Sequence, residues 1–425
     1  MIGEKIYKLC EELFPINRSL TGNGVRETFK ILKREVPELN IFEVPSGTKC
    51  FDWTVPKEWN MQDAYIIVPN GNKICNFKQN NLHIVGYSTP INKTMKLEEL
   101  NQYLYSLPES PTAIPYITSY YKERWGFCIS HNQRQLLKEG DYKVYIDSSL
   151  ENGNMTYGEL LIKGDTEEEI FISTYICHPS MANNELSGPA LTIHLAKYIQ
   201  NLKSKRYSYR IVFIPETIGS ILYLSKHVDS MKKNTVAGFN ITCVGDNNAY
   251  SYLPSRNGGT LADNVALHVL KYSKREFKEY SFLDRGSDER QYCSPNVDLP
   301  ICSIMRTKYA EFEEYHTSLD NLDYISAEGF NGAYDIYIKV ITALENNYKY
   351  KSTVLCEPQL GKRGLYPTIS TKNTKDIVKN MMDFLAYCDG SLDLISIANI
   401  INVPIWELYD MVNNIQKEKL IIKEK

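Results

Sequence analysis

Residues 168–202, EEIFISTYICHPSMANNELSGPALTIHLAKYIQNL, contain the pattern that decides the fold. The first ten residues form a mostly apolar run of strand length, and residues 188–202 have the apolar spacing of an amphipathic helix. The apolar run YRIVFIP (209–215) then precedes the helical pattern SILYLSKHV (220–228), and VAGFNITCVG (236–245) is a third apolar run. Continuous apolar strands that alternate with helices indicate a parallel sheet covered on both faces.

The sequence on either side of this part differs in character. Short extended runs punctuated by proline, glycine and asparagine fill residues 40–130, which is typical of a small β-rich module. Three helical patterns and a short apolar run follow residue 375, as in a winged helix. We predict an α/β fold: a central, mostly parallel sheet flanked by helices, with a small β-rich inserted domain and a C-terminal winged-helix domain. The predicted boundaries are 1–50 and 131–350 for the main domain, 51–130 for the insert and 375–425 for the winged helix.

Composition argues against several classes of protein. The 425 residues suit two or three domains, and the net charge of −3 gives no general basic field for nucleic acid or an anionic membrane. The ten cysteines form no C-x-x-C pair, so we expect no structural zinc knuckle. The first residues, MIGEKIYKLCEEL, lack a secretory apolar core, and no apolar run approaches the roughly 20 residues of a membrane span. We therefore expect a cytoplasmic protein with free thiols and no membrane partner.

The last helical pattern, IWELYDMVNNIQKEKL (405–420), does not have the charge of a DNA-reading helix. It carries three acidic side chains and two lysines: Glu407, Asp410, Glu418, Lys417 and Lys419. This balance does not favour phosphate, so we expect no nucleic-acid partner. Trp406 and Tyr409, which we expect to be exposed, suit a protein contact better, within the chain or in a homo-oligomer.

Polar side chains follow the predicted strands at the point where each strand ends. His178 follows the first apolar run, Glu216 the second and Asp246 the third. Asp288, in GSDERQYCSP, and His316, in EEYHTSLDN, come later in the chain. Ligands of open α/β sheets bind beyond the carboxyl ends of the strands, so these side chains are candidates for one site.

Each candidate also has an ordinary structural explanation. His178 and His316 could be packed histidines, and Glu185, in ANNELSG, could only favour the start of the next helix. Asp288 could form an ion pair with a neighbouring arginine. Glu216 could be a solvated carboxylate, but an apolar strand that places it in a crevice would raise its pKa and suit a general base.

Five motifs, taken in order, resemble a known superfamily: HPSMANNELSGPAL, PETIGS, FNITCVGD, GSDERQYCSP and EYHTSLDN. Their order is similar to that in the zinc aminopeptidase superfamily, which has a phosphorylase/hydrolase-like α/β fold. Nearly the whole chain resembles, more closely, a bacterial family of aminopeptidase-like proteins. Its members carry an inserted small domain and a C-terminal winged helix, and often lie among polysaccharide-biosynthesis genes. The wider resemblance covers residues 150–345 and the N-terminal helices.

The resemblance implies roles for some residues and losses at others. The superfamily's two histidine ligands, its general base and an aspartate close to the site correspond to His178, His316, Glu216 and Asp288. Three positions that carry carboxylate ligands in the superfamily correspond to Asn184, Thr217 and a position near Thr242. Two neighbouring dications need several negative charges to offset their repulsion, so these departures argue against a two-zinc centre.

A single zinc ion remains the prediction. Two histidines and one glutamate, with an open position for water, are a recurrent catalytic zinc set, and we expect His178, His316 and Glu185 to supply it. The metal would lower the pKa of its bound water toward about 7. Glu216 would take the proton of that water and return it to the leaving amine. Asp288 would orient a ligand histidine or the amine of the substrate.

The predicted function is therefore a zinc-dependent, aminopeptidase-like hydrolase that cleaves an amide bond in a small peptide or another amide-containing substrate. Arg290 or Arg306 could bind a carboxylate of the substrate or the developing oxyanion. The alternative is a catalytically silent or glycan-related binding protein in polysaccharide biosynthesis, which the neutral residues Asn184, Thr217 and Thr242 favour. A DNA-associated regulator is a third alternative.

Overall fold

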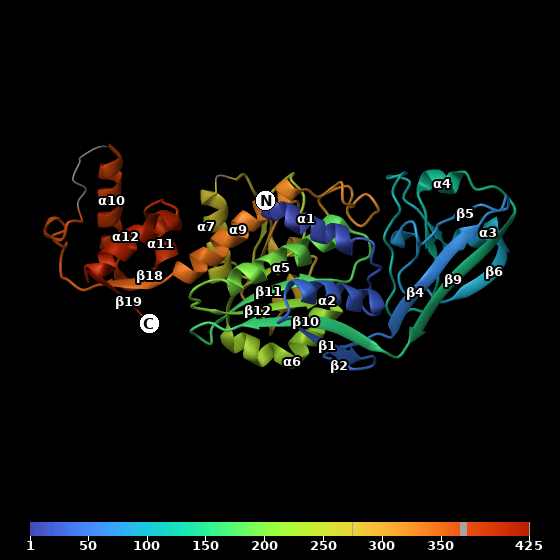
Figure 1. Cartoon of the computed structure of the whole chain (residues 1–425), viewed down its shortest axis with the longest axis horizontal. Coiled ribbons are helices and arrows are strands. Elements are labelled where there is room, and N and C mark those ends of the chain that lie inside the picture. Colours follow the sequence, from blue (N-terminus) through green and yellow to red (C-terminus); the bar gives the residue numbers. More distant parts are fainter. Residues whose placement is uncertain (274, 366–371, 425) are drawn as a thin grey trace. The chain divides into compact units, whose positions relative to one another are not determined.

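The computed structural model describes residues 1–273, 275–365 and 372–424. The chain forms two compact units, and Figure 1 labels several elements of each. Unit 1 consists of Met1–Ala262 and Phe277–Tyr334, and unit 2 consists of Asp263–Glu276 and Asp335–Lys425. Two helices carry residues of both units: α7 (Leu261–Tyr272) and α9 (Ala327–Asn346).

Unit 1 contains an eight-stranded sheet whose central strands are parallel. The strand order is β1-β10-β12-β11-β13-β16-β14-β15. β12, β11, β13 and β16 are parallel neighbours, whereas β1 and β10 run antiparallel at one edge and β14 is antiparallel to β16. The bounds are β1 Asn40–Pro45, β10 Asn154–Ile162, β11 Glu169–Tyr175, β12 Ser208–Ile214, β13 Thr235–Asn240, β14 Ser251–Leu253, β15 Lys278–Glu279 and β16 Ile301–Met305. The predicted α/β class with a mostly parallel central sheet is confirmed.

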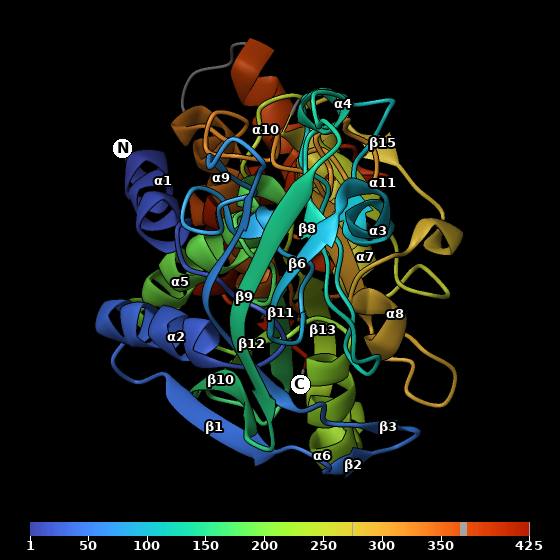
Figure 2. The same cartoon turned by 90° about the vertical axis from the view of Figure 1, so that its right-hand side faces the viewer.

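Helices cover both faces of this sheet, as Figures 1 and 2 show. α1 (Ile2–Leu13), α2 (Asn23–Glu35) and α5 (Ser187–Gln200) lie on one face, and α6 (Ile218–Asn234) lies on the other. Every residue of β11 is buried, as expected for a strand covered on both sides. The chain order β11-α5-β12-α6-β13 brings the carboxyl ends of three parallel strands to the same edge of the sheet.

A second, antiparallel sheet of four strands, in the order β5-β4-β9-β6, follows the N-terminal helices. Its strands are β4 Glu58–Ile67, β5 Lys73–Ile74, β6 Ile91–Lys96 and β9 Asp141–Glu151. β9 pairs with β4 and β6 although it lies beyond residue 130, where the predicted insert ends. Unit 1 also contains short elements: β2 Lys49–Cys50, β3 Trp53–Thr54, β7 Leu104–Tyr105, β8 Phe127–Cys128, α3 Leu97–Leu100, α4 His131–Gln135 and α8 Glu289–Tyr292.

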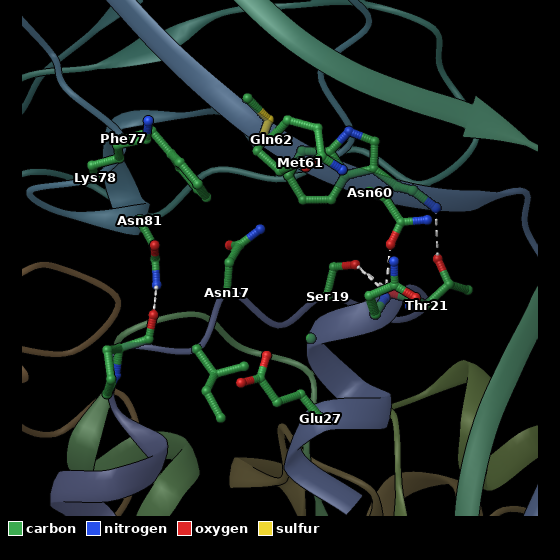
Figure 3. Close-up of a pocket in the computed structure, with 15 residues that line it drawn as sticks. Asn17, Ser19, Thr21, Glu27, Asn60, Met61, Gln62, Phe77, Lys78 and Asn81 are labelled. Carbon is green, nitrogen blue, oxygen red and sulfur yellow. Dashed lines mark hydrogen bonds between the residues drawn. The ribbon is translucent and has the colours of Figure 1, made fainter. Parts of the chain in front are cut away.

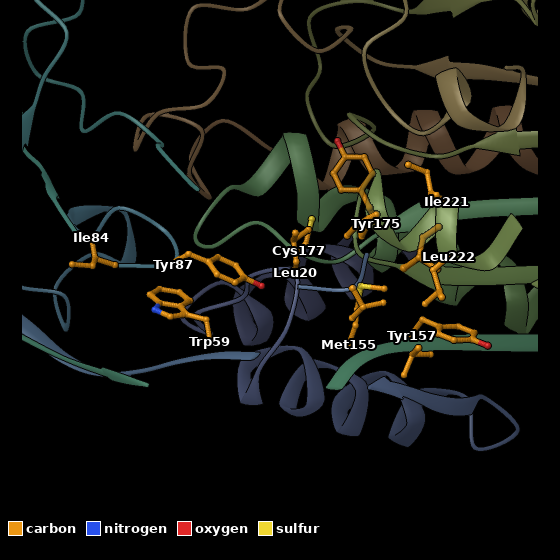
Figure 4. Close-up of a cluster of buried hydrophobic side chains, with 14 of the residues drawn as sticks. Leu20, Trp59, Ile84, Tyr87, Met155, Tyr157, Tyr175, Cys177, Ile221 and Leu222 are labelled. Carbon is orange, nitrogen blue, oxygen red and sulfur yellow. The ribbon is translucent and has the colours of Figure 1, made fainter. Parts of the chain in front are cut away.

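One hydrophobic cluster joins the two larger sheets of unit 1 (Figure 4). It runs from Trp59 of β4 and the nearby Tyr87, through Cys177, to Tyr157 of β10 and Leu222 of α6. Because the cluster is continuous, the four-stranded sheet shares one hydrophobic core with the eight-stranded sheet. All ten cysteines are free thiols. None of the described helices is both long and apolar enough to cross a lipid bilayer.

Besides its parts of α7 and α9, unit 2 contains a three-stranded sheet, in the order β18-β17-β19, and three further α-helices among its described residues. The bounds are β17 Lys349–Ser352, α10 Lys372–Ala386, β18 Asp389–Asp393, α11 Leu394–Ile400, α12 Ile405–Lys417 and β19 Ile421–Lys423. This arrangement confirms the predicted winged-helix region. Trp406 and Tyr409 are half-buried rather than exposed. The ring of Trp406 lies 6.1 Å from that of His268, and Nζ of Lys339 lies 5.4 Å from it, so this aromatic packs within its own unit.

Candidate active site

The candidate active site lies where the loops after β11 and β12 meet a loop from later in the chain. His178 follows β11, Glu216 follows β12, and His316 lies between β16 and α9. The ring centroids of His178 and His316 are 5.6 Å apart, and Oε2 of Glu216 lies 3.7 Å from Nε2 of His178. Three side chains that the strand-end pattern singles out are therefore neighbours in space.

Tyrosine rings surround the two imidazoles. The Tyr116 ring lies 5.3 Å from that of His178 and 5.2 Å from that of His316, and Tyr315 stacks on His316 at 3.9 Å. Burial lowers the pKa of His178 well below its ordinary value, and the neighbouring His316 adds to this effect. Burial also lowers the pKa of His316 to about 4. Both imidazoles are neutral near pH 7, so each offers one N–H donor and one acceptor.

A segment that precedes β9 holds the His316 loop in place. The backbone N–H of Tyr116 donates to the carbonyl of His316 over 2.9 Å. Ile114 and Ser318, which are 204 residues apart, exchange two hydrogen bonds of 2.9 Å. His316 itself has a φ of 56°, a left-handed conformation that is uncommon for a residue other than glycine. The sequence reasoning missed Tyr116, because no local pattern indicates so distant a contact.

Glu216 combines partial solvent access with a raised pKa. About one-fifth of its side chain is exposed (20%), whereas the side chain of His178 is almost fully buried. Burial raises the pKa of Glu216 to about 8, and the neighbouring carboxyl of Asp288 adds to this rise. A carboxyl group with a pKa this high exchanges its proton near neutral pH, which suits acid–base catalysis.

The backbone just after Glu216 is strained. Thr217 has φ 65° and ψ −75°, and the N–H of Ile218 donates to the carbonyl of Glu216 over 2.8 Å. These values describe a γ-turn of the rare type with positive φ. Oδ1 of Asp288 holds this turn, because it accepts hydrogen bonds from the N–H of Thr217 (2.7 Å) and from Oγ of Ser220 (2.8 Å). Asp288 therefore positions Glu216 through the backbone, and burial raises the pKa of Asp288 to about 7.

The two candidate arginines differ in position. Arg290 is exposed, and its Nη2 donates to Oγ1 of Thr217 over 2.6 Å, which places a cation beside the Glu216 turn. Arg306 is buried, lies 4.0 Å from the Tyr250 ring and donates to Oδ1 of Asn247. Arg290 therefore reaches the turn beside Glu216 directly.

Glu185 does not face the two imidazoles as a free ligand. Its carboxylate forms a fully buried ion pair with Arg18, in which Nε lies 3.2 and 3.0 Å from the two carboxylate oxygens and Nη2 lies 2.9 Å from Oε2. Burial raises the pKa of Glu185 to about 7, and Arg18 opposes that rise. Because the guanidinium engages both oxygens, the structure argues against Glu185 as a metal ligand. Arg18, 167 residues earlier in the chain, was not among the predicted site residues.

Two further carboxylates shape the loop that precedes α5. Asp320 accepts hydrogen bonds from the N–H groups of Asn183 (2.6 Å) and Asn184 (2.9 Å), and burial raises its pKa to about 7. Asp246 accepts hydrogen bonds from Nδ2 of Asn183 (3.1 Å) and from the N–H and Oγ1 of Thr307 (2.9 and 2.7 Å). Both carboxylates are therefore used by the fold.

Neutral side chains pack together around Asn184 and Thr242, two of the positions at which the resemblance implies the loss of a carboxylate. The Tyr175 hydroxyl donates to the carbonyl of Asn184 over 2.5 Å and lies 2.6 Å from Oγ1 of Thr242. Nδ2 of Asn184 is buried and has no hydrogen-bond partner within the described chain. Tyr175, Asn184 and Thr242 form a packed, uncharged cluster, which is not the donor set of a dication.

The residues present do not fit a zinc centre. Across residues 1–273, 275–365 and 372–424, no group of three or more histidine, cysteine, aspartate or glutamate side chains is placed to hold a metal ion. The predicted set of His178, Glu185 and His316 lacks its carboxylate, because Arg18 binds it. What the site offers is an imidazole pair, a proton-exchanging carboxyl at Glu216 and an exposed guanidinium.

Comparison with known proteins agrees with this geometry at the level of the fold. A family model described as a domain of unknown function, DUF4910, matches residues 7–347. The chain belongs to this family. A second model, described as a winged helix-turn-helix, matches residues 348–423. Helix-turn-helix modules read DNA in other proteins, so this match gives no support to the expectation that nucleic acid is not a partner.

Two relatives of this DUF4910 chain carry names that mention a peptidase or an aminopeptidase-like domain. A Clostridium acetobutylicum protein, described as a candidate polysaccharide biosynthesis protein with an aminopeptidase-like domain, is 51% identical over 86% of this chain and 84% of its own length. The crystal structure of a candidate peptidase from the same species is 45% identical, with a TM-score of 0.94, and the match covers 99% of this chain and 96% of that one. The resemblance to bacterial aminopeptidase-like proteins is confirmed.

A more distant structure shows the fold alone. A zinc aminopeptidase from Bacillus subtilis is 10% identical, with a TM-score of 0.57, over 80% of this chain and 94% of its own. At this identity the shared architecture carries no argument about metal ligands. This DUF4910 chain is therefore an aminopeptidase-like protein by fold and family, and its chemistry has to be argued from its own residues.

Proposed function

We propose that the chain is a peptidase-like hydrolase that cleaves an amide bond, with Glu216 as the general base. The observation that supports this most directly is the placement of Glu216. Its carboxyl group stands at the end of β12, partly exposed, 3.7 Å from an imidazole and with a raised pKa. A general base has to reach a water molecule and exchange a proton near the working pH, and Glu216 meets both requirements.

Each neighbouring residue has a role in this proposal. Glu216 removes a proton from water as the water oxygen attacks the carbonyl carbon, and the proton passes to the leaving amine as the C–N bond breaks. The neutral His178 and His316 offer hydrogen bonds to the amide that is cleaved. Arg290 supplies positive charge for a substrate carboxylate or for the developing oxyanion. Asp288 keeps the Glu216 turn in shape through the Thr217 N–H.

Zinc is not part of this proposal. The described residues bring two imidazoles and one carboxyl near each other but do not form a three-donor group. The catalytic steps above are carried by the side chains of the chain itself. The substrate class that we propose is a small peptide or another compound with an accessible amide.

The test is hydrolysis of amino-acid p-nitroanilides and dipeptide amides by the full-length chain. We expect Glu216→Gln to lower kcat by about 100-fold or more, which is the usual contribution of a general base. Glu313→Gln, an exposed glutamate at the start of the His316 loop, is the matched control and should keep full activity. An active enzyme in which Glu216→Gln retains its kcat would rule out this role for Glu216.

A second function is favoured by the uncharged Tyr175, Asn184 and Thr242 cluster. A catalytically silent, glycan-related binding protein would keep the fold and lose the carboxylates that hold metal. The name of the Clostridium relative, which mentions polysaccharide biosynthesis, agrees with this alternative. It predicts that the unmodified chain and Glu216→Gln are equally inactive on every amide of the panel.

A further inference from the structure

A polar pocket of about 490 Å³ shares no lining residue with the candidate active site. Its walls are residues 15–24, the start of β4 and the segment around Phe77 and Asn81 (Figure 3). This volume lies within the range of about 300–1,000 Å³ that is usual for small-molecule sites. The whole pocket belongs to unit 1.

Several polar side chains around the pocket have no partner within the described chain. The amides of Asn17 and Gln62 form no side-chain hydrogen bond there, and the exposed carboxylate of Glu27 forms no ion pair there. Figure 3 shows Asn17 and Glu27 reaching into the space that Met61 and Phe77 border. Planar amide and carboxylate groups can each bind two neighbouring hydroxyl groups, since they offer two donor or acceptor positions in one plane.

The walls behind these free groups are held by internal hydrogen bonds. Oδ1 of Asn60 accepts the N–H of Asn23 over 2.7 Å, and Oγ1 of Thr21 accepts the N–H of Trp59 over 3.1 Å. Nδ2 of Asn81 donates to the carbonyl of Pro15 over 3.1 Å, which closes the opposite wall. A pocket whose walls are fixed while some of its polar groups stay free is prepared for a ligand.

Apolar side chains complete the pocket. Ile16, Met61 and Phe77 line it, and the Trp59 ring is fixed behind them by stacking on Tyr87 at 5.6 Å. A ligand that fits must therefore present C–H surface to these side chains and hydroxyl groups to the amides. Sugars combine both kinds of surface in one small molecule.

The charges in the pocket disfavour an anionic ligand. Lys78 is the pocket's lysine, and its Nζ already lies 3.2 Å from Oδ2 of Asp63. Glu27 adds a negative charge without a partner in the described chain. Phosphate sites in proteins normally rely on arginine, lysine or several aligned N–H groups, so a nucleotide or phosphosugar is not the preferred occupant.

We propose that this pocket binds an uncharged, polyhydroxylated ligand of mono- or disaccharide size. Asn17, Gln62 and Glu27 bind its hydroxyl groups, and Met61 and Phe77 contact its C–H surface. The proposal is independent of amide hydrolysis at Glu216. Its failure would leave the hydrolase proposal untouched, because the two tests measure different events at different residues.

The test is saturation-transfer NMR and calorimetry on the full-length chain with D-glucose, D-galactose, N-acetyl-D-glucosamine and maltose, with UDP as an anionic comparator. We expect at least one of the four sugars to bind. Asn17→Ala and Glu27→Gln should each lower the affinity for that sugar by about tenfold, which is the effect of losing one hydrogen bond of ~1.4 kcal/mol. Asn92→Ala and Glu98→Gln, at exposed positions in the same part of the chain, are the matched controls and should leave affinity unchanged.

Three results would overturn the proposal. The first is the absence of binding by all four sugars at millimolar concentration. The second is sugar binding that Asn17→Ala and Glu27→Gln leave unchanged, which would place the sugar elsewhere. The third is binding of UDP without binding of any neutral sugar. Thermal denaturation of each variant checks that it is folded, and both substitutions change partly exposed side chains that hold no wall in place.

Discussion

The candidate active site and the polar pocket belong to the same unit, but among the described residues some polar side chains of the pocket lack the partners that most carboxylates of the active site have. At the strand ends, most of the carboxylates already have partners, such as Arg18 for Glu185 and backbone N–H groups for Asp320. In the pocket, Asn17 and Glu27 have none within the described chain. The difference indicates which polar groups build the structure and which are available to a ligand.

The backbone near the strand ends adopts unusual conformations, which the hydrogen-bonded side chains there help to hold. Ser180, Thr217, Cys243 and His316 all have positive φ, and each is within three residues of a candidate side chain. Such conformations cost about 1–3 kcal/mol each and persist only when the surroundings enforce them. Asp288 supplies that enforcement at the Glu216 turn, and hydrogen bonds with Ile114 and Tyr116 supply it at the His316 loop. Many of the carboxylates at this edge of the sheet therefore hold the backbone in its conformation and do not serve to bind a metal ion.

The Arg18–Glu185 ion pair should give the largest effect on stability. Arg18→Ala leaves a fully buried carboxylate without its partner, so we expect the free energy of unfolding to fall by about 3–5 kcal/mol. Chemical denaturation measures this loss. Arg34→Ala, which removes an exposed pair with Glu12, is the control and should cost at most about 1 kcal/mol.

The double variant Arg18→Met with Glu185→Leu sharpens this test. Replacing both charges by apolar side chains removes the buried charge as well as its partner, so we expect it to be clearly more stable than Arg18→Ala. If Arg18→Ala were as stable as the Arg34→Ala control, Glu185 would have another partner, and a bound cation would be the first candidate to examine.

The sequence predicted the edge of the sheet better than the contacts made there. Apolar runs ending in His178 and Glu216 placed both side chains correctly, because parallel strands share one carboxyl edge. The partners of these residues could not be predicted in the same way. Arg18 reaches Glu185 across 167 residues, and Tyr116 reaches His316 from a segment with no regular periodicity. Contacts of that kind depend on how the elements pack.

The raised carboxyl pKa values predict the pH dependence of stability. Burial raises the pKa of Glu216 to about 8 and those of Asp288 and Asp320 to about 7. A carboxyl group with a raised pKa in the folded state binds its proton more tightly there than in the unfolded chain. Its contribution to stability is complete below its unfolded pKa and is lost as pH rises through the folded value.

We therefore expect the free energy of unfolding to fall between about pH 7 and about pH 8, by up to about 1 kcal/mol for each such group. In this range the buried imidazoles of His178 and His316 are neutral in the folded chain and mostly neutral in the unfolded chain, so they do not oppose the trend as they would near pH 5. Urea denaturation across this range measures the slope. Glu216→Gln should flatten it, whereas Glu313→Gln should not. Stability that rises between these two pH values would show that the carboxyls are ionised in the folded chain, as they would be beside a bound cation.

The strained turn at Thr217 predicts a smaller effect. Glycine adopts φ 65° without steric cost, so Thr217→Gly should stabilise the chain by about 0.5–1 kcal/mol after the greater entropy of the unfolded state is counted. Thermal denaturation provides the measurement, with Thr217→Ser as the control that keeps the hydroxyl bonded to Arg290. If Thr217→Gly destabilises the chain, the packing energy of the threonine side chain is larger than the strain energy of the turn.

Removal of metal should have the smallest effect of all. A structural or catalytic zinc ion contributes to stability by binding the folded state, so a chelator lowers the melting temperature of a protein that depends on one. In the described part of the chain the donors do not form a three-ligand group, and we expect dialysis against EDTA to leave the melting temperature and any amide hydrolysis unchanged. Elemental analysis after zinc loading should find well under one ion per chain, in the unmodified protein and in His178→Ala alike.

One zinc per chain that is lost in His178→Ala, but kept in an exposed-surface variant such as Glu98→Gln, would establish a metal centre and reverse this conclusion. The carboxylate would then have to come from Glu216 or from a Glu185 released by Arg18, and comparing zinc content in Glu216→Gln and Glu185→Gln would decide between them.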